Sequence, residues 1–430
     1  RGGIMATFSK IWKNADLRKR ILFTLMIFIV YRLGSYIPVP TINTSVLEAS
    51  AQTPMLGFID TLSGGALKRF SLFAMSISPY ITASIVIQLL QMDVVPILSE
   101  WAKEGETGKR KLNQLTRYVT LVLAFVQAIA MSIGFDLGYQ GILLESHSVI
   151  TYLYIALTMT AGTAVMIFLA DQITSKGIGN GTSMIIVAGI LSRVPYMLND
   201  LYTKYLVNIT VSNVLAFISV LALLALTIIA VIYLQSATRK LPIQYANRHN
   251  SAQLSGRKDS FIPLKLNSAG VIPVIFAASL VSLPLTVVNF LPESGVTNVI
   301  KAIFNYQQPI GFILYVVLIV AFTYFYAFVQ VSPEKVAENL KKQGSYIPGV
   351  RPGVDTEEYL SKVLSRITFI GAIYLVVIAG LPIVFGAITD LPSSVEIGGT
   401  SLLIVVGVAI ETAKQIQTKT MDQKYKGFIK

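Results

Sequence analysis

Residues 213–235 read NVLAFISVLALLALTIIAVIYLQ, a run without a charged side chain. A helix that crosses the hydrocarbon core of a bilayer needs about 20 predominantly apolar residues, so this run is long enough to span a membrane once. Nine further stretches of similar character lie on either side of it. The ten predicted spans, numbered in chain order, are residues 21–40, 71–92, 115–135, 150–170, 178–197, 213–235, 268–290, 309–331, 365–387 and 398–415.

The composition of the 430 residues also predicts an integral membrane protein built of helices. Apolar residues make up 53% of the chain and charged residues only 13%, whereas soluble proteins carry about 25% charged residues. This balance excludes a disordered chain and argues against a soluble multi-domain enzyme. The chain has no cysteine and only two histidines, His147 and His249, so neither a thiolate site nor a zinc site is expected.

Lysine and arginine residues gather on alternate connections between the predicted spans. Counted together with the adjoining span ends, the two termini and the connections that follow spans 2, 4, 6 and 8 hold 29 of the 35 Lys and Arg residues. Because positively charged connections stay on the cytoplasmic side of a membrane, both termini are expected to be cytoplasmic. The 22 acidic residues fall in connections or near span ends, whereas ion-coupled transporters keep ionisable groups at mid-membrane.

Ten spans divide into two halves of five, and a repeated unit with an odd number of spans has inverted topology. Residues 79–85 in span 2 (PYITASI) and residues 273–280 in span 7 (PVIFAASL) give a weak hint of such a repeat. The predicted organisation is a cytoplasmic segment 1–20, an N-terminal half 21–197, a C-terminal half 198–415 with cytoplasmic connections at about 236–267 and 332–364, and a cytoplasmic tail 416–430.

Six motifs follow one another along nearly the whole chain. They are Ile37–Pro40, Leu72–Leu90 (LFAMSISPYITASIVIQLL), Asp171–Ser183 (DQITSKGIGNGTS), Leu241–Ala246, Gly270–Pro273 and Ile347–Gly353. In this order they resemble the SecY/Sec61 family of protein-conducting channels, and most closely its bacterial SecY branch. The resemblance implies an all-α integral membrane fold, with ten transmembrane helices in two inverted five-helix halves around a central pore and a short re-entrant plug helix. It also implies a channel subunit that passes unfolded, signal-bearing polypeptides and releases apolar segments sideways into lipid.

The resemblance assigns a pore ring and a plug. An apolar ring excludes ions by dewetting, and packing or lipid contact is the alternative role for each of its members. The ring residues would be Ile81, Ile85, Ile186, Ile272, Leu280 and Leu402, of which the first two share a helix face. The plug would lie at about 54–67 on the external side, where an ordinary external loop is the alternative. Its residues would be Phe58, Ile59, Asp60, Thr61, Leu62, Ser63, Gly64 and Gly65.

Three amides in or near the spans, Gln88, Gln127 and Asn267, are expected to face protein or a water-filled path, because an amide exposed to lipid is costly. The resemblance places Gln88 and Gln127 near a lateral gate, the seam where spans 2 and 3 face spans 7 and 8. Asn267 would lie close to the cytoplasmic end of that seam. Static hydrogen bonding between helices is the alternative role. Hydrogen bonds across such a seam are worth about 0.6–2 kcal/mol each, so a signal sequence could open it.

The connections after spans 6 and 8 are basic and longer than a tight connection requires. Such loops could project into an acidic groove or onto ribosomal RNA, although a role in topology alone is the alternative. The predicted contact residues are Arg239, Lys240, Arg248 and Arg351. Gly349, Pro352 and Gly353 frame Arg351 in a stiff turn, and by resemblance this arginine engages the SecA motor.

The sequence contains no phosphate-binding loop, no HExxH metal motif and no nucleophile elbow. The chain is therefore not expected to be an enzyme or to hold a cofactor or metal, and its driving energy would come from outside. The resemblance implies SecE and SecG subunits, the SecA motor ATPase, the ribosome, signal peptides with their preproteins, and membrane lipid as partners, in the plasma membrane of a bacterium. The alternatives from other classes are a secondary solute transporter and a membrane scaffold or insertase without a pore.

Overall fold

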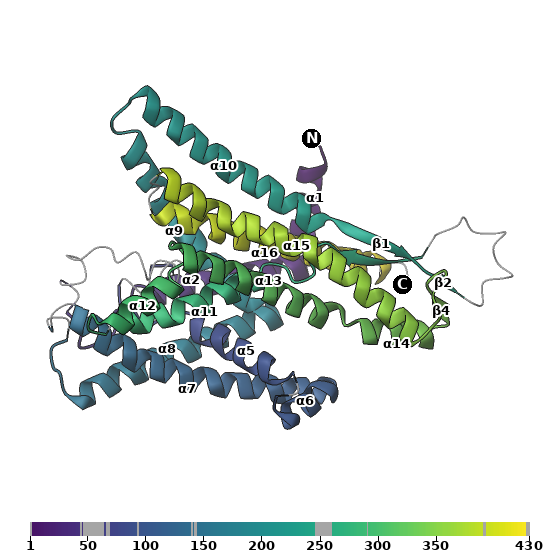
Figure 1. The fold of residues 1–430 in the computed structure, drawn as a ribbon, viewed down its shortest axis with the longest axis horizontal. Helices are drawn as coiled ribbons and strands as arrows, with labels where there is room; N and C mark the ends of the chain where they lie inside the picture. The colour runs from purple at the N-terminus through teal and green to yellow at the C-terminus, as the bar shows by residue number, and fades with distance from the viewer. Residues whose placement is uncertain are drawn as a thin grey trace.

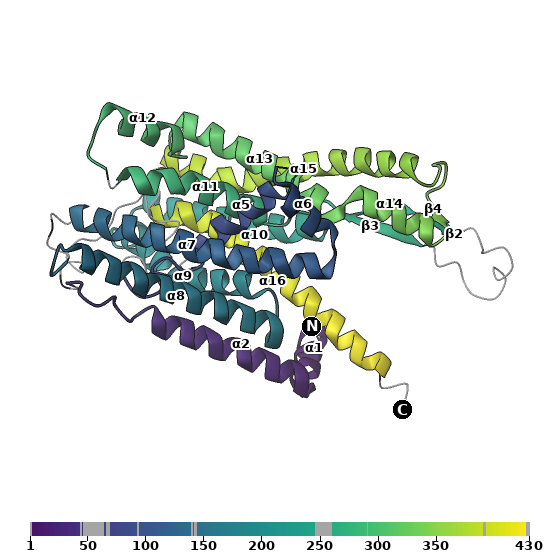
Figure 2. The same ribbon diagram turned by 90° about the horizontal axis from the view of Figure 1, so that it is seen from below.

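The computed structural model describes residues 2–43, 45, 64–65, 69–92, 94–138, 141, 144–245, 260–289, 291–389 and 393–426. Within these ranges the chain is a bundle of long helices with small strand pairs at one end (Figures 1 and 2).

The described elements alternate between long helices and short connecting pieces. The helices are α1 (Gly2–Lys13), α2 (Ala15–Gly34), α5 (Ser78–Leu90), α6 (Pro96–Lys103), α7 (Glu106–Gly138), α8 (Val149–Lys176), α9 (Gly181–Tyr205), α10 (Val211–Ser236), α11 (Ile272–Asn289), α12 (Gly295–Phe304), α13 (Pro309–Val331), α14 (Pro333–Lys342), α15 (Val354–Thr389) and α16 (Ser393–Lys426). The strands are β1 (Thr238–Pro242), β2 (Gln244–Tyr245), β3 (Phe261–Lys265) and β4 (Ser345–Tyr346).

Each of the ten predicted spans coincides with a helix, in the order α2, α5, α7, α8, α9, α10, α11, α13, α15 and α16. By length and composition, six of the described helices could cross a membrane, namely α7, α8, α9, α10, α13 and α15. Helices α5 and α11 are shorter apolar helices. The remaining long elements, α2 and α16, carry charged residues beside their apolar runs.

Spans 2 and 7 begin later than their apolar runs predict. Residues 71–77 form turns rather than helix, and α5 begins only at Ser78, with Pro79 in its first turn. In the same way α11 begins at Ile272, directly before Pro273 and after Gly270, whose φ is +68°. Proline lacks an N–H and its ring clashes with the carbonyl four residues earlier in a helix, so it is tolerated only in the first helical turn. Hydrophobicity alone therefore overestimates the length of both helices.

The two halves repeat the same pattern of neighbours. In the N-terminal half α5 packs on α7, α7 on α8, α8 on α9, and α2 on α9; in the C-terminal half α11 packs on α13, α13 on α15, α15 on α16, and α10 on α16. Helices in equivalent places of the two halves share these partners, as an internal repeat requires, but the packing of α2 on α8 has no counterpart of the same extent between α10 and α15 among the described residues. Two seams join the halves, one between α5 and α11 and the other between α9 and both α16 and α10.

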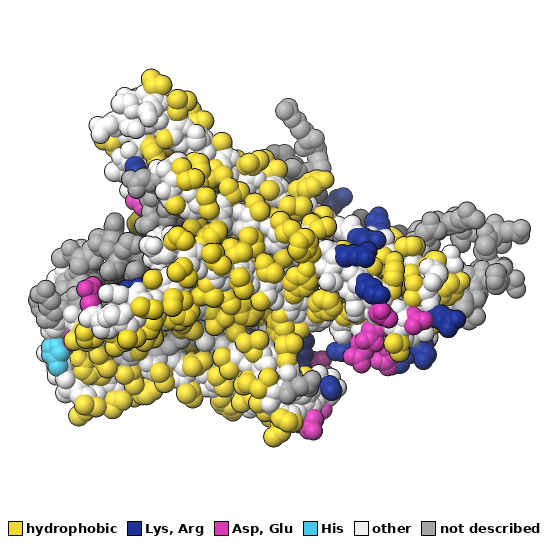
Figure 3. Space-filling model, viewed as in Figure 1, with side chains coloured by type: hydrophobic (Ala, Val, Ile, Leu, Met, Phe, Trp, Pro, Cys, Tyr) yellow, Lys and Arg dark blue, Asp and Glu magenta, His cyan; other side chains and the backbone are white. Residues whose placement is uncertain are grey.

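Apolar and charged side chains separate along the long axis of the molecule. Figure 3 shows hydrophobic side chains covering the long helices, whereas Lys, Arg, Asp and Glu gather at the end that carries β1 and α14. The helix α10 leans away from the bundle (Figure 1) and exposes large apolar residues along its length, including Leu215, Leu226 and Ile229. An apolar surface of this extent is expected where lipid is the solvent.

The strand pairs join two connections of the C-terminal half. In the connection between α10 and α11, β1 pairs with β3 in antiparallel fashion, while β2 pairs with β4, which lies between α14 and α15. Tyr346 donates a hydrogen bond to Gln244 Oε1 at 3.0 Å. A shared apolar core lies under these strands and includes Leu241, Leu264, Leu340, Ile347 and Leu360. The two basic connections therefore form one packed unit.

Candidate functional site

The largest apolar cluster of the molecule lies where both halves meet. Buried residues from α5, α9, α11, α13, α15 and α16 contribute to it. Ile81 and Ile85 of α5 and Ile186 of α9 are buried members, while Ile272 and Leu280 of α11 are partly buried and pack against it. We call these five residues the apolar waist. Five of the six predicted ring residues thus lie in or against one cluster that spans the two halves.

Leu402, the sixth predicted ring residue, has a less central place. It lies on α16 and is partly buried, whereas its neighbours Leu403 and Ile404 are fully buried in the cluster. Adjacent residues of a helix point about 100° apart, so Leu402 does not share the face that Leu403 presents to the centre. Its membership of a ring stays a prediction.

Most of the predicted plug cannot be placed, because Phe58, Ile59, Asp60, Thr61, Leu62 and Ser63 lie outside the described residues. Gly64 and Gly65 are described, with φ values of +67° and +84° that only glycine adopts readily. The carbonyl of Gly64 accepts hydrogen bonds from Arg32 Nη1 at 2.9 Å and from Arg69 Nη2 at 3.2 Å. A Cβ atom on Gly64 would lie 2.6 Å from Ser192 Oγ of α9, so this point is held tightly against α2 and α9.

The segments that come before and after the predicted plug are joined by backbone hydrogen bonds. Val39 donates a backbone hydrogen bond to Phe70, and Leu72 donates one to Ile37. Phe70 and Val39 are almost fully buried in a second apolar cluster with residues of α7 and α8. The structure therefore fixes both segments to the N-terminal half.

Gln88 forms a hydrogen bond across the seam between the halves. The Tyr326 hydroxyl of α13 donates to Gln88 Oε1 of α5, and Tyr326 is almost fully buried. The ring of Tyr326 also packs in a T-shaped arrangement against Phe276 on α11, with ring centroids 5.1 Å apart. The seam where α5 meets α11 and α13 thus has one polar contact beside packed aromatic rings, as a separable interface between helices in lipid would.

The other two predicted gate amides lie elsewhere. Gln127 is partly buried on α7, which packs on α5 and α8. Asn267 is buried just before α11, and its Nδ2 donates to the Gly270 carbonyl at 3.0 Å, within its own turn. The structure brings neither amide to the Gln88–Tyr326 contact, and a gate role for Gln127 and Asn267 stays a prediction.

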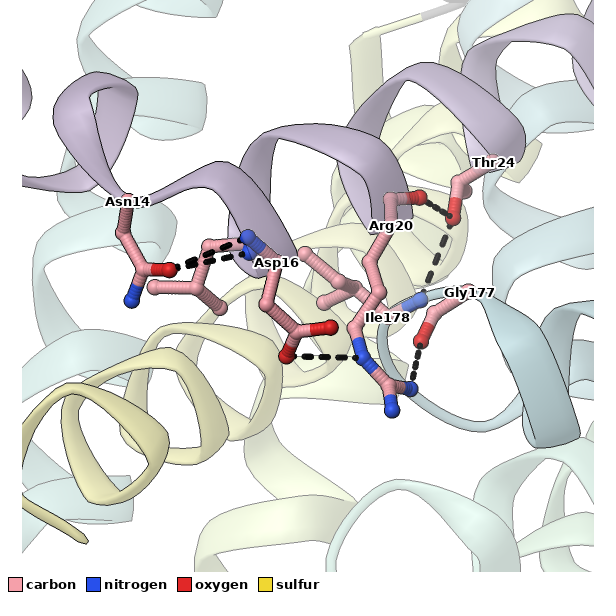
Figure 4. Close-up of polar contacts among 7 residues, drawn as sticks. Asn14, Asp16, Arg20, Thr24, Gly177 and Ile178 are labelled. Atoms are coloured by element: carbon pink, nitrogen blue, oxygen red, sulfur yellow. Dashed lines mark hydrogen bonds and ion pairs between the residues drawn. The ribbon is translucent and has the colours of Figure 1, made fainter. Parts of the chain in front are cut away.

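The glycine-rich motif between α8 and α9 contacts helices of both halves. Arg20 Nη1 of α2 donates to the Gly177 carbonyl at 3.3 Å, and Thr24 Oγ1 accepts from the Ile178 N–H at 3.1 Å (Figure 4). From the C-terminal half, Gln415 Oε1 of α16 accepts from the Gly179 N–H at 2.8 Å. The loop at residues 177–179 is therefore fastened to α2 and α16, the helices of the first and the last predicted span.

The glycines of this motif are required by close packing. A Cβ atom on Gly181 would lie 1.7 Å from the Ala170 carbonyl oxygen, and one on Gly177 would lie 2.6 Å from Thr24 Oγ1. Gly179 has a φ of +80°. Any side chain at these places would overlap atoms of α2 or α8 or strain the backbone, which explains the motif as a packing requirement.

The predicted contact residues of the basic connections are on the surface. Arg239 and Lys240 lie exposed on β1, where the Lys240 ammonium is 4.7 Å from the centroid of the Phe261 ring. Arg351 is exposed before α15, and its carbonyl accepts a hydrogen bond from Thr356 Oγ1 at 2.7 Å. Arg248 lies outside the described residues. Since β2 pairs with β4, Arg351 and β1 belong to one exposed, rigid unit.

Two contact residues were missed by the sequence analysis. Tyr326 and Gln415 each bond to a partner more than two hundred residues away in the chain. Tyr326 lies in the apolar helix α13, and a polar group there signals that a polar partner exists, but the sequence does not say which one. Gln415 is exposed in a polar stretch of α16 and gives no such signal.

Comparison with known proteins agrees with this arrangement. Residues 71–413 match the SecY protein family. The protein translocase subunit SecY of Bacillus licheniformis is 51% identical over 427 residues, which cover 99% of both chains. The subunit of the same name from Bacillus subtilis is 50% identical over 430 residues, again covering 99% of both chains.

Solved structures share the fold. One described as a protein conducting channel superposes with a TM-score of 0.64 at 17% identity and 96% coverage of each chain. Sec61 in a canine ribosome–channel complex gives a TM-score of 0.62 at 16% identity, also with 96% coverage of each chain. These likenesses confirm the predicted all-α channel fold, and the full-length identity to bacterial relatives settles the family. The chain belongs to the SecY family.

Proposed function

We propose that this chain is the central channel subunit of a bacterial Sec translocon, which passes unfolded, signal-bearing polypeptides and releases apolar segments sideways into lipid. The proposal rests on one structural observation, the apolar waist at the junction of the two halves. Ile81, Ile85 and Ile186 provide no polar partner for a hydrated ion, so a constriction lined by them would resist ion flow while yielding to a polypeptide.

The seam beside the waist supports a lateral exit. Helix α5 contributes Ile81 and Ile85 to the waist and Gln88 to the bond with Tyr326. Separation of α5 from α11 and α13 would therefore widen the waist and break that bond in one movement. A single hydrogen bond between helices in lipid is worth about 0.6–2 kcal/mol, which insertion of an apolar signal sequence could offset.

The partners follow from the family and from the exposed basic unit. We propose that SecE and SecG complete the channel, and that the SecA motor and the ribosome dock on the unit that carries Arg239, Lys240 and Arg351. Arg248, which lies outside the described residues, stays a predicted further contact. The separation of Lys and Arg along the chain supports placement in a bacterial plasma membrane with both termini in the cytoplasm. Signal peptides, preproteins and membrane lipid would be the remaining contacts.

Energy would be supplied by these partners, because the channel proposed here performs no chemical step. The solute-transporter alternative is not supported, since the full-length relatives are translocase subunits. A scaffold without a pore would not need an apolar constriction shared between two separable halves.

The decisive test is reconstitution of the chain with SecE in proteoliposomes, with SecA, ATP and a preprotein added outside. We expect ATP-dependent protection of the preprotein from added protease. Protection that is equal with and without ATP, or equal in vesicles lacking the chain, would refute the proposal. A preprotein with a charged residue in its signal sequence is the matched substrate control, and it should remain accessible.

A further inference from the structure

The N-terminal helix α1 lies outside the bundle and is separated from α2 by a capped break. Asn14 has extended backbone angles, and its side chain accepts hydrogen bonds from the N–H groups of Asp16 and Leu17. This side-chain cap begins α2 and ends any continuation from α1. Figure 2 shows α1 turning away from α2 at the end of the bundle from which the C-terminal part of α16 also emerges.

One face of α1 exposes aromatic side chains. Phe8 and Trp12 are one helical turn apart, and their side chains are 68% and 46% exposed. Ile11, which lies on the flank of this face nearer to Phe8, is partly buried. Lys10 and Lys13 are exposed and fall on the remaining surface of the helix. A short helix with aromatic residues on one face and lysines on the other is typical of a segment that lies in a membrane interface.

The exposed apolar surface of α2 indicates the depth in the bilayer at which α1 lies. Leu22, Leu25, Met26, Ile29 and Leu33 are all exposed at helical spacing, so the hydrocarbon-facing stripe begins at Leu22. The exposed Arg18 and Lys19 come directly before this stripe. Tryptophan and basic residues are enriched at this depth of a bilayer, and α1 is joined to it through Asn14.

Arg20 does not share this role, because its guanidinium is engaged inside the protein. It contacts Asp16 Oδ2 at 3.4 Å and the Gly177 carbonyl at 3.3 Å (Figure 4). Asp16, the only acidic residue among the first twenty, is thereby paired with Arg20. Among the described residues of α1 and the first turns of α2, four further cations are exposed, namely Lys10, Lys13, Arg18 and Lys19.

We propose that α1 is a binding element for anionic phospholipids. Phe8 and Trp12 insert at the boundary between headgroups and acyl chains, and the four cations contact lipid phosphates. Clusters of four or more basic residues next to a transmembrane helix are attracted to anionic lipid within a Debye length. The proposal requires only that α2 crosses the membrane, so it stands or falls separately from the channel function.

The two tryptophans of the chain make the proposal directly measurable. They are Trp12 and Trp101, so Trp101→Phe leaves Trp12 as the only indole. The full-length variant is reconstituted into vesicles of phosphatidylcholine brominated near the headgroup, with and without phosphatidylglycerol. We expect bromine to quench Trp12 fluorescence, iodide in the water phase to quench it weakly, and phosphatidylglycerol to strengthen the bromine quenching.

Charge reversal on α1 tests the electrostatic part. In the Trp101→Phe background, Lys10→Glu with Lys13→Glu should reduce quenching in mixed vesicles to the level seen in phosphatidylcholine alone. The same change on α14, Lys335→Glu with Lys341→Glu, is the matched control and should leave quenching unaltered. Circular dichroism confirms that both variants keep their helix content.

Three outcomes would overturn the proposal. Trp12 could remain fully accessible to iodide in both kinds of vesicle. Its quenching by bromine could be indifferent to phosphatidylglycerol and to charge reversal. Shielding from iodide could also arise only after another subunit is added, which would assign the α1 face to a protein. Preprotein uptake is not read out here, so none of these results bears on the proposed channel.

Discussion

Tyr326 on α13 and Gln88 on α5 form a side-chain hydrogen bond that joins the two halves of the chain across 238 residues of sequence. The bond lies at the seam where α5 meets α11, and Phe276 of α11 packs against the same tyrosine ring. Because each half contributes one side chain to this hydrogen bond, the two side chains can be replaced singly and together.

Replacement of Tyr326 by Phe should weaken the closed seam, because the ring is kept and only the hydroxyl is lost. Removal of one interhelical hydrogen bond worth about 0.6–2 kcal/mol raises an opening constant about 3- to 30-fold. We expect greater export of a preprotein with a defective signal sequence. The measurement is ATP-dependent protection of that preprotein in proteoliposomes.

Tyr324→Phe is the matched control for this experiment, since Tyr324 is a partly buried tyrosine on the same helix. The double variant with Gln88→Leu should gain no more than either single variant, because both changes remove the same bond. Unchanged tolerance of the defective signal in both single variants would show that the bond does not hold the seam.

Replacement of Ile85 by Asn should make the resting channel leak ions. Ile85 is buried in the apolar waist, and an amide there offers hydrogen bonds to water that isoleucine does not. We expect higher ion conductance of planar bilayers containing the variant in the absence of preprotein. Val165→Asn, at an exposed place on α8, introduces the same amide away from the waist, and equal conductance of the two variants would contradict the prediction.

Replacement of Gly181 by Ala should destabilise the whole bundle. The new methyl group would lie 1.7 Å from the Ala170 carbonyl oxygen, so α8 and α9 must move apart, at a cost of about 1–3 kcal/mol. The measurement is the midpoint of thermal unfolding in detergent. Gly295→Ala introduces the same methyl group where no atom lies within 4 Å, and it should leave the midpoint unchanged; an equal fall in both variants would rule out the packing explanation.

Replacement of Arg351 by Glu should abolish ATP-driven uptake while leaving the fold intact. The side chain is exposed, and only its backbone carbonyl accepts a hydrogen bond, from Thr356. Reversal of its charge would therefore remove the proposed docking contact without disturbing packing. Lys335→Glu, on the exposed surface of α14, makes the same charge change in the same connection; normal uptake by the Arg351 variant would disprove the role in motor contact.

The sequence predicts the helices well because lipid imposes a simple rule on every spanning segment. Each apolar run of sufficient length became a helix, since backbone groups in hydrocarbon must be satisfied within the segment. The rule misjudges where α5 begins, because Phe73 and Ala74 are apolar but precede Pro79 in a turn. There proline decides the boundary and hydrophobicity does not, because its ring would clash with the carbonyl four residues earlier if the helix began sooner.

Contacts between distant residues could not be predicted in the same way. The amide of Gln88 in an apolar helix predicts a polar partner, but any of several polar side chains could have filled that role. Only the packing of α13 selects Tyr326. The pairing of β2 with β4 could not be predicted from the sequence either, because strands of two residues are too short to show a periodic pattern. The separate helix α1 was also missed, since the basic segment suggested topology rather than structure.

The pairing of β2 with β4 has a mechanical consequence. Because these strands are bonded above a shared apolar core, a push on the loop that carries Arg351 is passed to the connection between α10 and α11 as well. A motor docked on this unit, as proposed, would therefore act on the connections before α11 and before α15 together. Any relative movement of the two halves that followed would load the Gln88–Tyr326 bond between them.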